Sequence, residues 1–546
     1  MFSLHRNIPA LRRRDVDTAA IRQHYYPEGG WGWVVCAAGF LARLLAAAAQ
    51  FAFGLLYLYA VHHLADKGRV LPDTRQWKAM EIAVAWLGAL SAAMSLLAAP
   101  LAVALCRRKW TRLSAVLAGL VMALGCLFAS FAMQLHQLLV SYGLLLGAAS
   151  GLVRETASLT LGHYFRRRRE FVEMLMQAGA GAGIALFSVF YWEAIGQWGW
   201  RLGLQAVTVL LCAAFFLGML YRSASMYHPQ RRAIQHLKNQ RKKVKLKKTP
   251  QHRQPKQPFF DLTPLRIRAV QLLMLAAAVA AFGVYSPLFY LALQGQREGL
   301  DERALVLLQT FLGCATALGC VGFGLMVVRA SDQCLVSRQY LCQAAMVGIG
   351  VSLLALGSVE GYHGYVLIVW LYGVCLGGFV YSFKVFAMEC VRSRYFARAW
   401  GFVQGAEAVP LLVGVPVTGY INQNHPQAGY YFSMAATLAG AALLFVVGGG
   451  SRRGWDSVPG GCGALPDGPL AAAAPVPLPG APGVRPHPLL TKSMSFGTPL
   501  DLPPPDDILW RPVRSCRSEP ESLGRPPPPA AAAAAFTVVE QITTCV

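Results

Sequence analysis

The sequence contains little charge for its length. Of 546 residues only 14% are Asp, Glu, Lys or Arg, whereas 55% are hydrophobic. In a soluble globular chain about a quarter of all residues are usually charged, because the water-exposed surface consists largely of polar and charged side chains. The shortage excludes an ordinary soluble protein and predicts that much of the chain contacts lipid.

The sequence also lacks the patterns of enzymes, metal sites and disulfide frameworks. Its 13 cysteines include no CxxC pair and no His/Cys spacing suited to zinc. Most of them, such as Cys36, Cys126 and Cys212, lie in apolar runs, where cysteine acts as a small hydrophobic side chain. No paired carboxylates, nucleophile elbow or phosphate loop occurs in a suitable context. We therefore expect no enzyme, no catalytic residue, no metal and no cofactor.

Long apolar runs recur along most of the chain, and about 20 apolar residues suffice to cross a bilayer as a helix. We predict an all-α polytopic membrane protein with 12 transmembrane helices. The predicted spans are 31–57, 80–104, 113–133, 137–161, 171–195, 201–221, 266–292, 304–328, 337–358, 364–388, 399–420 and 427–448.

Acidic residues are scarce, and the net charge of +24 is distributed unevenly. If the spans alternate, the connectors on the side of the N-terminus hold 30 Lys and Arg, and those on the other side hold seven. This is the positive-inside pattern, which predicts that both termini are cytoplasmic. The basic connectors favour an anionic lipid leaflet and not nucleic acid as their partner. The first run is too long for a signal h-region and should stay as a span, so we expect a multi-pass plasma-membrane protein.

Composition divides the chain into five parts. We predict a cytoplasmic segment 1–28, a six-helix half 29–221, a basic linker 222–265, a second six-helix half 266–448 and a disordered tail 449–546. The linker has twelve Lys or Arg and no acid between Tyr221 and Phe260. Such a block is usually solvated; attraction to the membrane surface and binding of calmodulin or phosphoinositide are the alternatives.

The tail is rich in Pro, Ala, Gly and Ser, which cannot form a packed core. It ends in QITTCV. Thr544 and the terminal Val546 match the pattern that PDZ domains bind by strand addition, so a PDZ-domain protein is a candidate partner.

Two segments of the chain repeat. YFRRRREFVE begins at Tyr164 and YFARAWGFVQ begins at Tyr395, and Glu173 aligns with Gln404. Both segments lie between the fourth and fifth predicted span of their own half. Parallel six-span repeats build major facilitator transporters, whose substrate site lies between the halves near the bilayer midplane. The repeat therefore predicts the major facilitator fold.

Ionisable residues inside spans are costly and are functional candidates. In the facilitator architecture the first, fourth, seventh and tenth spans line the central cavity. We predict that Arg43 and Glu155 form a neutral pair, that Arg154 binds an anionic substrate, and that Lys384 faces this anion from the other half. The alternative is that these residues form gate or packing ion pairs without substrate contact.

Three further acids lie in predicted spans. Glu389, near the inner end of its span, favours a packing role, and Glu193 is expected at the interface. Glu407 lies in the eleventh span. Small residues in AGAGAG, from Ala178 to Gly183, predict close helix approach.

Two motifs resemble those of the monocarboxylate transporter family. PEGGWGWVV resembles the pattern [DE]-G-G-[WF]-G-W, and YFRRRREFVEMLMQAGAGAG resembles YFxxRRxxAxGxAxAG entering the fifth span. The resemblance covers Pro27 to about Val447. The matching residues are Glu28, Gly29, Gly30, Trp31, Gly32, Trp33, Tyr164, Phe165, Arg168 and Arg169.

The resemblance implies a transporter of small monocarboxylates or related organic anions that works by alternating access. It also implies proton coupling and a single-span accessory glycoprotein as a candidate partner. Family members that move lactate with a proton carry a Lys in the first span and an Arg and an Asp in the eighth. Here the corresponding positions are Phe51 or a close neighbour, Cys320 and a position near Val328, and the expected charges are absent from them.

These departures leave two other functions open. One is an uncoupled facilitator of aromatic amino acids or of another carboxylate-bearing metabolite. The other is a transporter-like scaffold or sensor that does not transport.

Overall fold

The computed structural model describes residues 26–68, 75–108, 110–227, 259–328, 337–359, 361–425 and 428–451. All of them belong to one compact unit, His24–Ser457. In these ranges the regular secondary structure is helical throughout, so the predicted all-α class is confirmed. The predictions for residues 1–25 of the N-terminal segment, for residues 228–258 of the linker, for the tail beyond Ser451 and for Thr544 and Val546 lie outside the described residues.

The first six passes, called here the first set, contain several segmented helices. The first pass is α2 and α3, the fourth combines α6, the π-helix η2 and α7, and the fifth is α8 with the π-helix η3. The bounds are α2 (Trp31–Phe51), α3 (Phe53–Gly68), α4 (Arg75–Arg107), α5 (Thr111–Phe131), α6 (Leu135–Leu138), η2 (Leu139–Leu146), α7 (Gly147–Tyr164), α8 (Arg169–Tyr191), η3 (Trp192–Gln197) and α9 (Trp198–Met219).

The last six passes, called the last set, begin with a helix broken before Ser286. Two short 3₁₀ turns, η4 (Ala224–Tyr227) and η6 (Thr263–Arg266), lie between the sets. The bounds are α11 (Arg268–Ala281), α12 (Ser286–Arg297), α13 (Glu302–Val328), α14 (Arg338–Leu356), α15 (Tyr362–Cys390), α16 (Ser393–Asn424) and α17 (Ala428–Ser451).

Eleven helical stretches in the described ranges are long and apolar enough to cross a membrane. The longest of them, Arg169–Met219, has 51 residues and contains two passes. Its helix is interrupted at Gly199, whose φ of +77° is a conformation that glycine adopts readily. The prediction of twelve membrane helices is confirmed, although some ends differ: the first pass continues to Gly68 and the second begins at Arg75.

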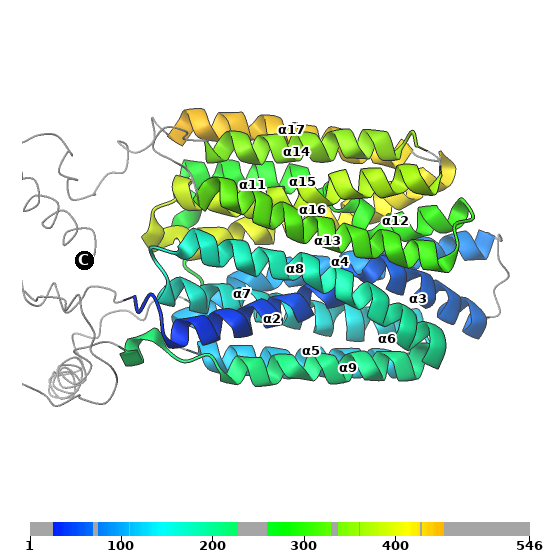
Figure 1. Cartoon of the computed structure of the whole chain (residues 1–546), viewed down its shortest axis with the longest axis horizontal. Coiled ribbons are helices and arrows are strands. Elements are labelled where there is room, and N and C mark those ends of the chain that lie inside the picture. Colours follow the sequence, from blue (N-terminus) through cyan, green and yellow to red (C-terminus); the bar gives the residue numbers. More distant parts are fainter. Residues whose placement is uncertain are drawn as a thin grey trace, which may run out of the picture. The chain divides into compact units, whose positions relative to one another are not determined.

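The helices run side by side, and the last set packs against the first (Figure 1). The contacts between the sets are made chiefly by α8 with α13 and by α4 with α16. At the first of these contacts a Cβ on Gly181 would lie 2.4 Å from the backbone nitrogen of Ala317, and a Cβ on Gly313 would lie 2.3 Å from that of Ala185. The prediction of close approach at AGAGAG is thereby confirmed. The division into two halves stays a prediction, because one compact unit contains both sets.

Candidate substrate cavity and the ion pairs around it

The two family motifs contact each other at one end of the bundle. Oε1 of Glu28 accepts hydrogen bonds from the backbone amides of Arg166 (2.6 Å) and Arg167 (2.7 Å). The amide of Glu28 donates to the carbonyl of Tyr164 at 3.1 Å. Glu28 has a φ of +51°, and its carboxylate lies against the turn between α7 and α8. Since a carboxylate beside free amides near a helix N-terminus is stabilising, the role of Glu28 here is structural.

Aromatic rings and arginines complete this cluster of motif residues. The rings of Trp33 and Phe165 lie 5.2 Å apart, and the guanidinium of Arg222 lies 4.2 Å from the centre of the Trp31 ring. Arg168 lies over Trp33, and Arg169 lies over Phe396 of the last set. The motif residues described so far therefore hold helix ends together.

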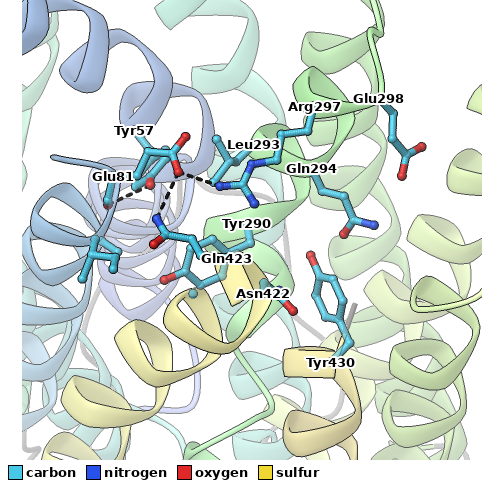
Figure 2. A pocket seen from close by; sticks show the side chains of 13 residues that line it. Tyr57, Glu81, Tyr290, Leu293, Gln294, Arg297, Glu298, Asn422, Gln423 and Tyr430 are labelled. Carbon is cyan, nitrogen blue, oxygen red and sulfur yellow. Dashed lines mark hydrogen bonds and ion pairs between the residues drawn. The ribbon is translucent and has the colours of Figure 1, made fainter. Parts of the chain in front are cut away.

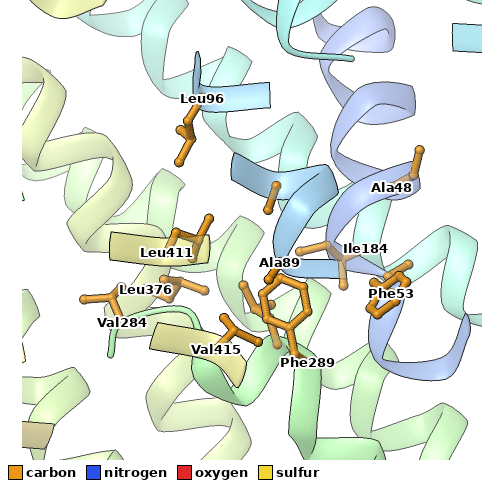
Figure 3. Packing of buried hydrophobic residues seen from close by; sticks show 14 of the residues in the cluster. Ala48, Phe53, Ala89, Leu96, Ile184, Val284, Phe289, Leu376, Leu411 and Val415 are labelled. Atoms are coloured by element: carbon orange, nitrogen blue, oxygen red, sulfur yellow. The ribbon is translucent and has the colours of Figure 1, made fainter. Parts of the chain in front are cut away.

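A central cavity of about 80 Å³ lies between the two sets. Its charged lining residues are Arg43 of α2, Arg154 of α7 and Glu407 of α16. The remaining walls are mostly apolar or aromatic, and they include Phe51, Tyr285, Phe379, Phe383 and Trp400. Apolar side chains from both sets line it, among them Leu96, Ile184, Leu376 and Leu411, and Figure 3 shows these four among the buried hydrophobic residues of the core. Because apolar walls lower the local dielectric constant, they strengthen electrostatic contacts inside the cavity.

The predicted pair between Arg43 and Glu155 is wrong. Glu155 instead accepts a hydrogen bond from Nε of its neighbour Arg154 at 3.0 Å, and both side chains are buried. Nη2 of Arg43 donates to Oε1 of Gln177 at 2.5 Å. The physical reason is packing: α2 lies against both α7 and α8, and the acceptor within hydrogen-bond distance of Arg43 is the amide of Gln177 on α8.

Lys384 lies beside the cavity and is engaged by a carboxylate. Its Nζ donates to Glu173 of α8 and to Oγ of Ser158 at 2.8 Å. Oε1 of Glu173 also accepts from Nε2 of Gln177 at 2.7 Å, so hydrogen bonds run from Arg43 to Lys384 across the two sets. Anion binding by Lys384 stays a prediction, and the alternative of a packing ion pair describes its present contacts.

Three buried polar atoms of the cavity lining have no hydrogen-bond partner in the described part of the chain. They are Nε of Arg43, Nε1 of Trp400 and Oε1 of Gln404. Glu407 is 7% exposed and likewise makes no hydrogen bond or ion pair with a described residue. Because unpaired buried polar groups cost free energy, these four groups are the ones that a bound molecule would satisfy.

Two of the three positions at which the family resemblance expects charges line this cavity, and the third lies at the end of α13. Phe51 lines it and stacks on Tyr285, with ring centres 6.2 Å apart. Cys320 also lines it and donates to the carbonyl of Gly377 at 3.3 Å. Val328 ends α13 and is 40% exposed. At the two positions that line the cavity, Phe51 and Cys320, an apolar and a weakly polar side chain thus stand where the family resemblance expects charges.

An ion pair joins the two sets at the end of the bundle that carries Glu81, called the Glu81 end. Nη2 of Arg297 on α12 lies 2.6 Å from Oε2 of Glu81 on α4, and Gln423 of α16 donates to the same oxygen at 3.2 Å. Figure 2 shows these contacts at the edge of a second cavity, of about 220 Å³. Sequence reasoning placed Arg297 in a loop and missed Glu81.

A second ion cluster joins the sets at the opposite end, called the Asp261 end. Asp261, which lies just before α11, pairs with Arg398 of α16 and lies 3.7 Å from Arg107 of α4. Hydrogen bonds from the hydroxyl and the amide of Thr263, together with the two arginines, hold the pKa of Asp261 below its usual value. The central cavity therefore lies between ion pairs at both ends.

Comparison with known proteins decides the family. The family model described as Major Facilitator Superfamily matches residues 35–409. The chain belongs to the major facilitator superfamily. It is therefore a member of a transporter family and not of an enzyme family.

Among curated superfamily members the chain is similar to monocarboxylate transporters. It is 25% identical to monocarboxylate transporter 12 of Rattus norvegicus over 77% of this chain and 84% of the relative. It is 23% identical to monocarboxylate transporter 10 of Danio rerio over 77% and 79%, and 23% identical to monocarboxylate transporter 2 of Homo sapiens over 78% and 87%. The predicted resemblance is confirmed as distant homology over most of the chain.

A solved structure of the superfamily shares the fold. The human organic anion transporter MFSD10 (TETRAN) aligns with a TM-score of 0.53 at 14% identity, over 76% of this chain and 99% of that one. Sequence reasoning missed three residues that line the central cavity of the present chain: Gln177, Trp400 and Gln404. The available signal was the internal repeat, which aligns Gln404 with the Lys384 partner Glu173.

Proposed function

We propose that this chain carries small carboxylate-bearing metabolites across a membrane by alternating access, with Arg154 and Arg43 binding the carboxylate. The observation that carries the proposal is the unpaired Nε of Arg43, which lies buried in the lining of the same apolar cavity as Arg154. The names of the relatives, monocarboxylate transporters and an organic anion transporter, support this substrate class.

The arrangement suits one carboxylate with an apolar body. A guanidinium offers its N–H groups to a carboxylate in a planar fork. Arg154 is already neutralised by Glu155 at 3.0 Å, so Arg43 supplies the positive charge that attracts the carboxylate, and Arg154 supplies further donors. The Nε1 donor of Trp400 and the ring of Phe51 would contact the rest of the substrate. Because the cavity is small, one end must open for entry.

The ion pairs that join the two helix sets toward each end of the bundle support alternating access. Opening at the Glu81 end requires that Arg297 leave Glu81, while the Asp261 and Lys384 pairs stay closed. Opening at the Asp261 end requires the reverse. Rigid movement of one helix set against the other about a bound substrate is how such folds work.

We also propose that the protein lies in the plasma membrane with both termini cytoplasmic and that it couples transport to protons. The asymmetry of 30 against seven basic residues supports the orientation. Lys384 would exchange Glu173 for the substrate anion when the Asp261 end opens. A PDZ-domain protein at Thr544 and Val546 and a single-span accessory glycoprotein remain proposed partners.

Uptake by the purified full chain in liposomes tests the proposal. The probes are labelled lactate, phenylpropionate and phenylalanine. We expect Arg154→Gln and Arg43→Gln each to reduce carboxylate uptake by about tenfold or more, since a lost charged contact in a buried site costs about 2–5 kcal/mol. Arg201→Gln, an exposed arginine over Phe131, is the control. Normal uptake by both variants contradicts the binding role, and absence of flux for every probe favours a scaffold or sensor.

A further inference from the structure

We propose that Glu407 takes up and releases the proton that accompanies each anion through the central cavity. This inference rests on the proposed function and assigns a residue to its coupling. The geometry that supports it is a buried carboxylate on α16 that lines the cavity and has no hydrogen bond or ion pair in the described part of the chain.

The charged groups around Glu407 are few. From α7 it is faced by Arg154 and Glu155, from α2 by Arg43, and the hydroxyl of Tyr285 is the other titratable neighbour. The neighbouring helices α4, α11 and α17 have no Asp, Glu, Lys or Arg in 82–106, 269–281 and 428–447. On α15, Lys384 is engaged by Glu173, and on α12, Arg297 is paired with Glu81.

Charge balance then requires a proton. In the empty cavity Arg154 and Glu155 neutralise each other, and the charge of Arg43 balances that of an ionised Glu407. A monovalent anion would add one uncompensated negative charge inside an apolar cavity, which costs several kcal/mol. Protonation of Glu407 removes that charge. The cavity is therefore neutral both empty and loaded only if one proton moves with each anion.

The proton step is simple acid–base chemistry. Water on the side of higher proton activity supplies the proton, which bonds to a carboxylate oxygen of Glu407 as the anion enters. After the cavity opens to the other side, the anion leaves and the O–H bond breaks, returning the proton to water.

A proton fits Glu407 better than an ammonium group of the substrate does. An ammonium has three donors to satisfy. Among the described buried lining atoms without a partner, only Oε1 of Gln404 is a further acceptor. A proton needs the carboxylate alone.

Transport with two matched probes tests the assignment, because phenylalanine is phenylpropionate with an added ammonium group. We expect an inward proton gradient to drive accumulation of phenylpropionate by the wild type. In Glu407→Gln this accumulation should fall to equilibration while exchange of internal for external phenylpropionate continues, and Glu407→Asp should restore part of the accumulation. Glu193→Gln, which changes an exposed carboxylate, is the control.

Two transport results overturn the inference. One is proton-driven accumulation that survives in Glu407→Gln. The other is a defect of that variant confined to phenylalanine, which would assign Glu407 to the substrate ammonium. Loss of exchange in Arg154→Gln and Arg43→Gln tests the carboxylate site separately, so failure of the proposed function is distinguishable.

Infrared spectroscopy tests the assignment without any substrate. As the pH is lowered, the substrate-free purified chain should develop the C=O band of a protonated buried carboxyl. The band should be absent in Glu407→Gln, shifted in Glu407→Asp and retained in Glu193→Gln. Identical spectra for the wild type and Glu407→Gln overturn the inference whatever the transport assays give.

Discussion

Glu173 on α8 and Lys384 on α15 form a buried ion pair that joins the first helix set to the last. Both side chains are less than a tenth exposed, and Gln177 and Ser158 provide the neighbouring hydrogen bonds. Buried pairs of this kind are costly to form, yet costlier to break on one side, because the remaining charge is left without a partner. The pair is thus suited to be present when the Asp261 end is closed and absent when that end is open.

Lys384→Met should destabilise the protein by about 3–5 kcal/mol, because Glu173 stays buried without its cation. The double variant with Glu173→Met should recover most of this loss. Thermal unfolding of the purified chain in detergent measures both effects. Equal losses for the single and double variants would show that the two side chains are not coupled.

Gly313→Ala should lower the melting temperature and reduce transport. Its Cβ would lie 2.3 Å from the backbone nitrogen of Ala185, so α13 must move away from α8. Gly322→Ala on the same helix is the matched control, because its Cβ would have nothing within 4 Å. For Gly322→Ala, helix propensity alone predicts that the free energy of unfolding rises by up to about 1 kcal/mol. Similar behaviour of the two variants would argue against close packing at Gly313.

Asp261 should contribute stability in a pH-dependent way. Its pKa is lowered first by the Thr263 hydroxyl and then by the Thr263 amide, Arg398 and Arg107. A depressed folded-state pKa means that the contribution is present above the ordinary value of about 3.9 and is lost as pH falls through the lower folded value. The melting temperature of the wild type should exceed that of Asp261→Asn at neutral pH, and the difference should close on acidification. A difference that grows on acidification would contradict this sign.

Arg297→Gln should open the Glu81 end more often. The Arg297 side chain is 41% exposed, so its pair with Glu81 contributes about 1 kcal/mol or less, which corresponds to at most about a fivefold change in population. A cysteine at Asn422, in the lining of the second cavity, should react up to about fivefold faster with an impermeant maleimide. Arg201→Gln is the control, and an unchanged rate in Arg297→Gln would remove the gate role of the pair.

The sequence predicted the membrane passes, their approximate ends and the family, because hydropathy and small-residue motifs are local properties. It identified Arg43, Arg154 and Glu155 as buried charges, but it assigned the wrong pair. The partner of Arg43 depends on which helix face lies against α2, and no spacing along the chain specifies that. Gln177 and Trp400 were missed for the same reason: each becomes a cavity residue only once α8 and α16 are placed.

The bond between Glu28 and the amides of Arg166 and Arg167 has a consequence for recognising relatives. The motif that contains Glu28 holds together the ends of α2, α7 and α8. The residues that line the central cavity lie outside this motif. Two proteins can therefore share all of these helix-end contacts and still transport unrelated substrates. Grouping such chains by Arg43, Gln404 and Glu407 should sort them by what they transport, and grouping them by the motif should sort them by ancestry.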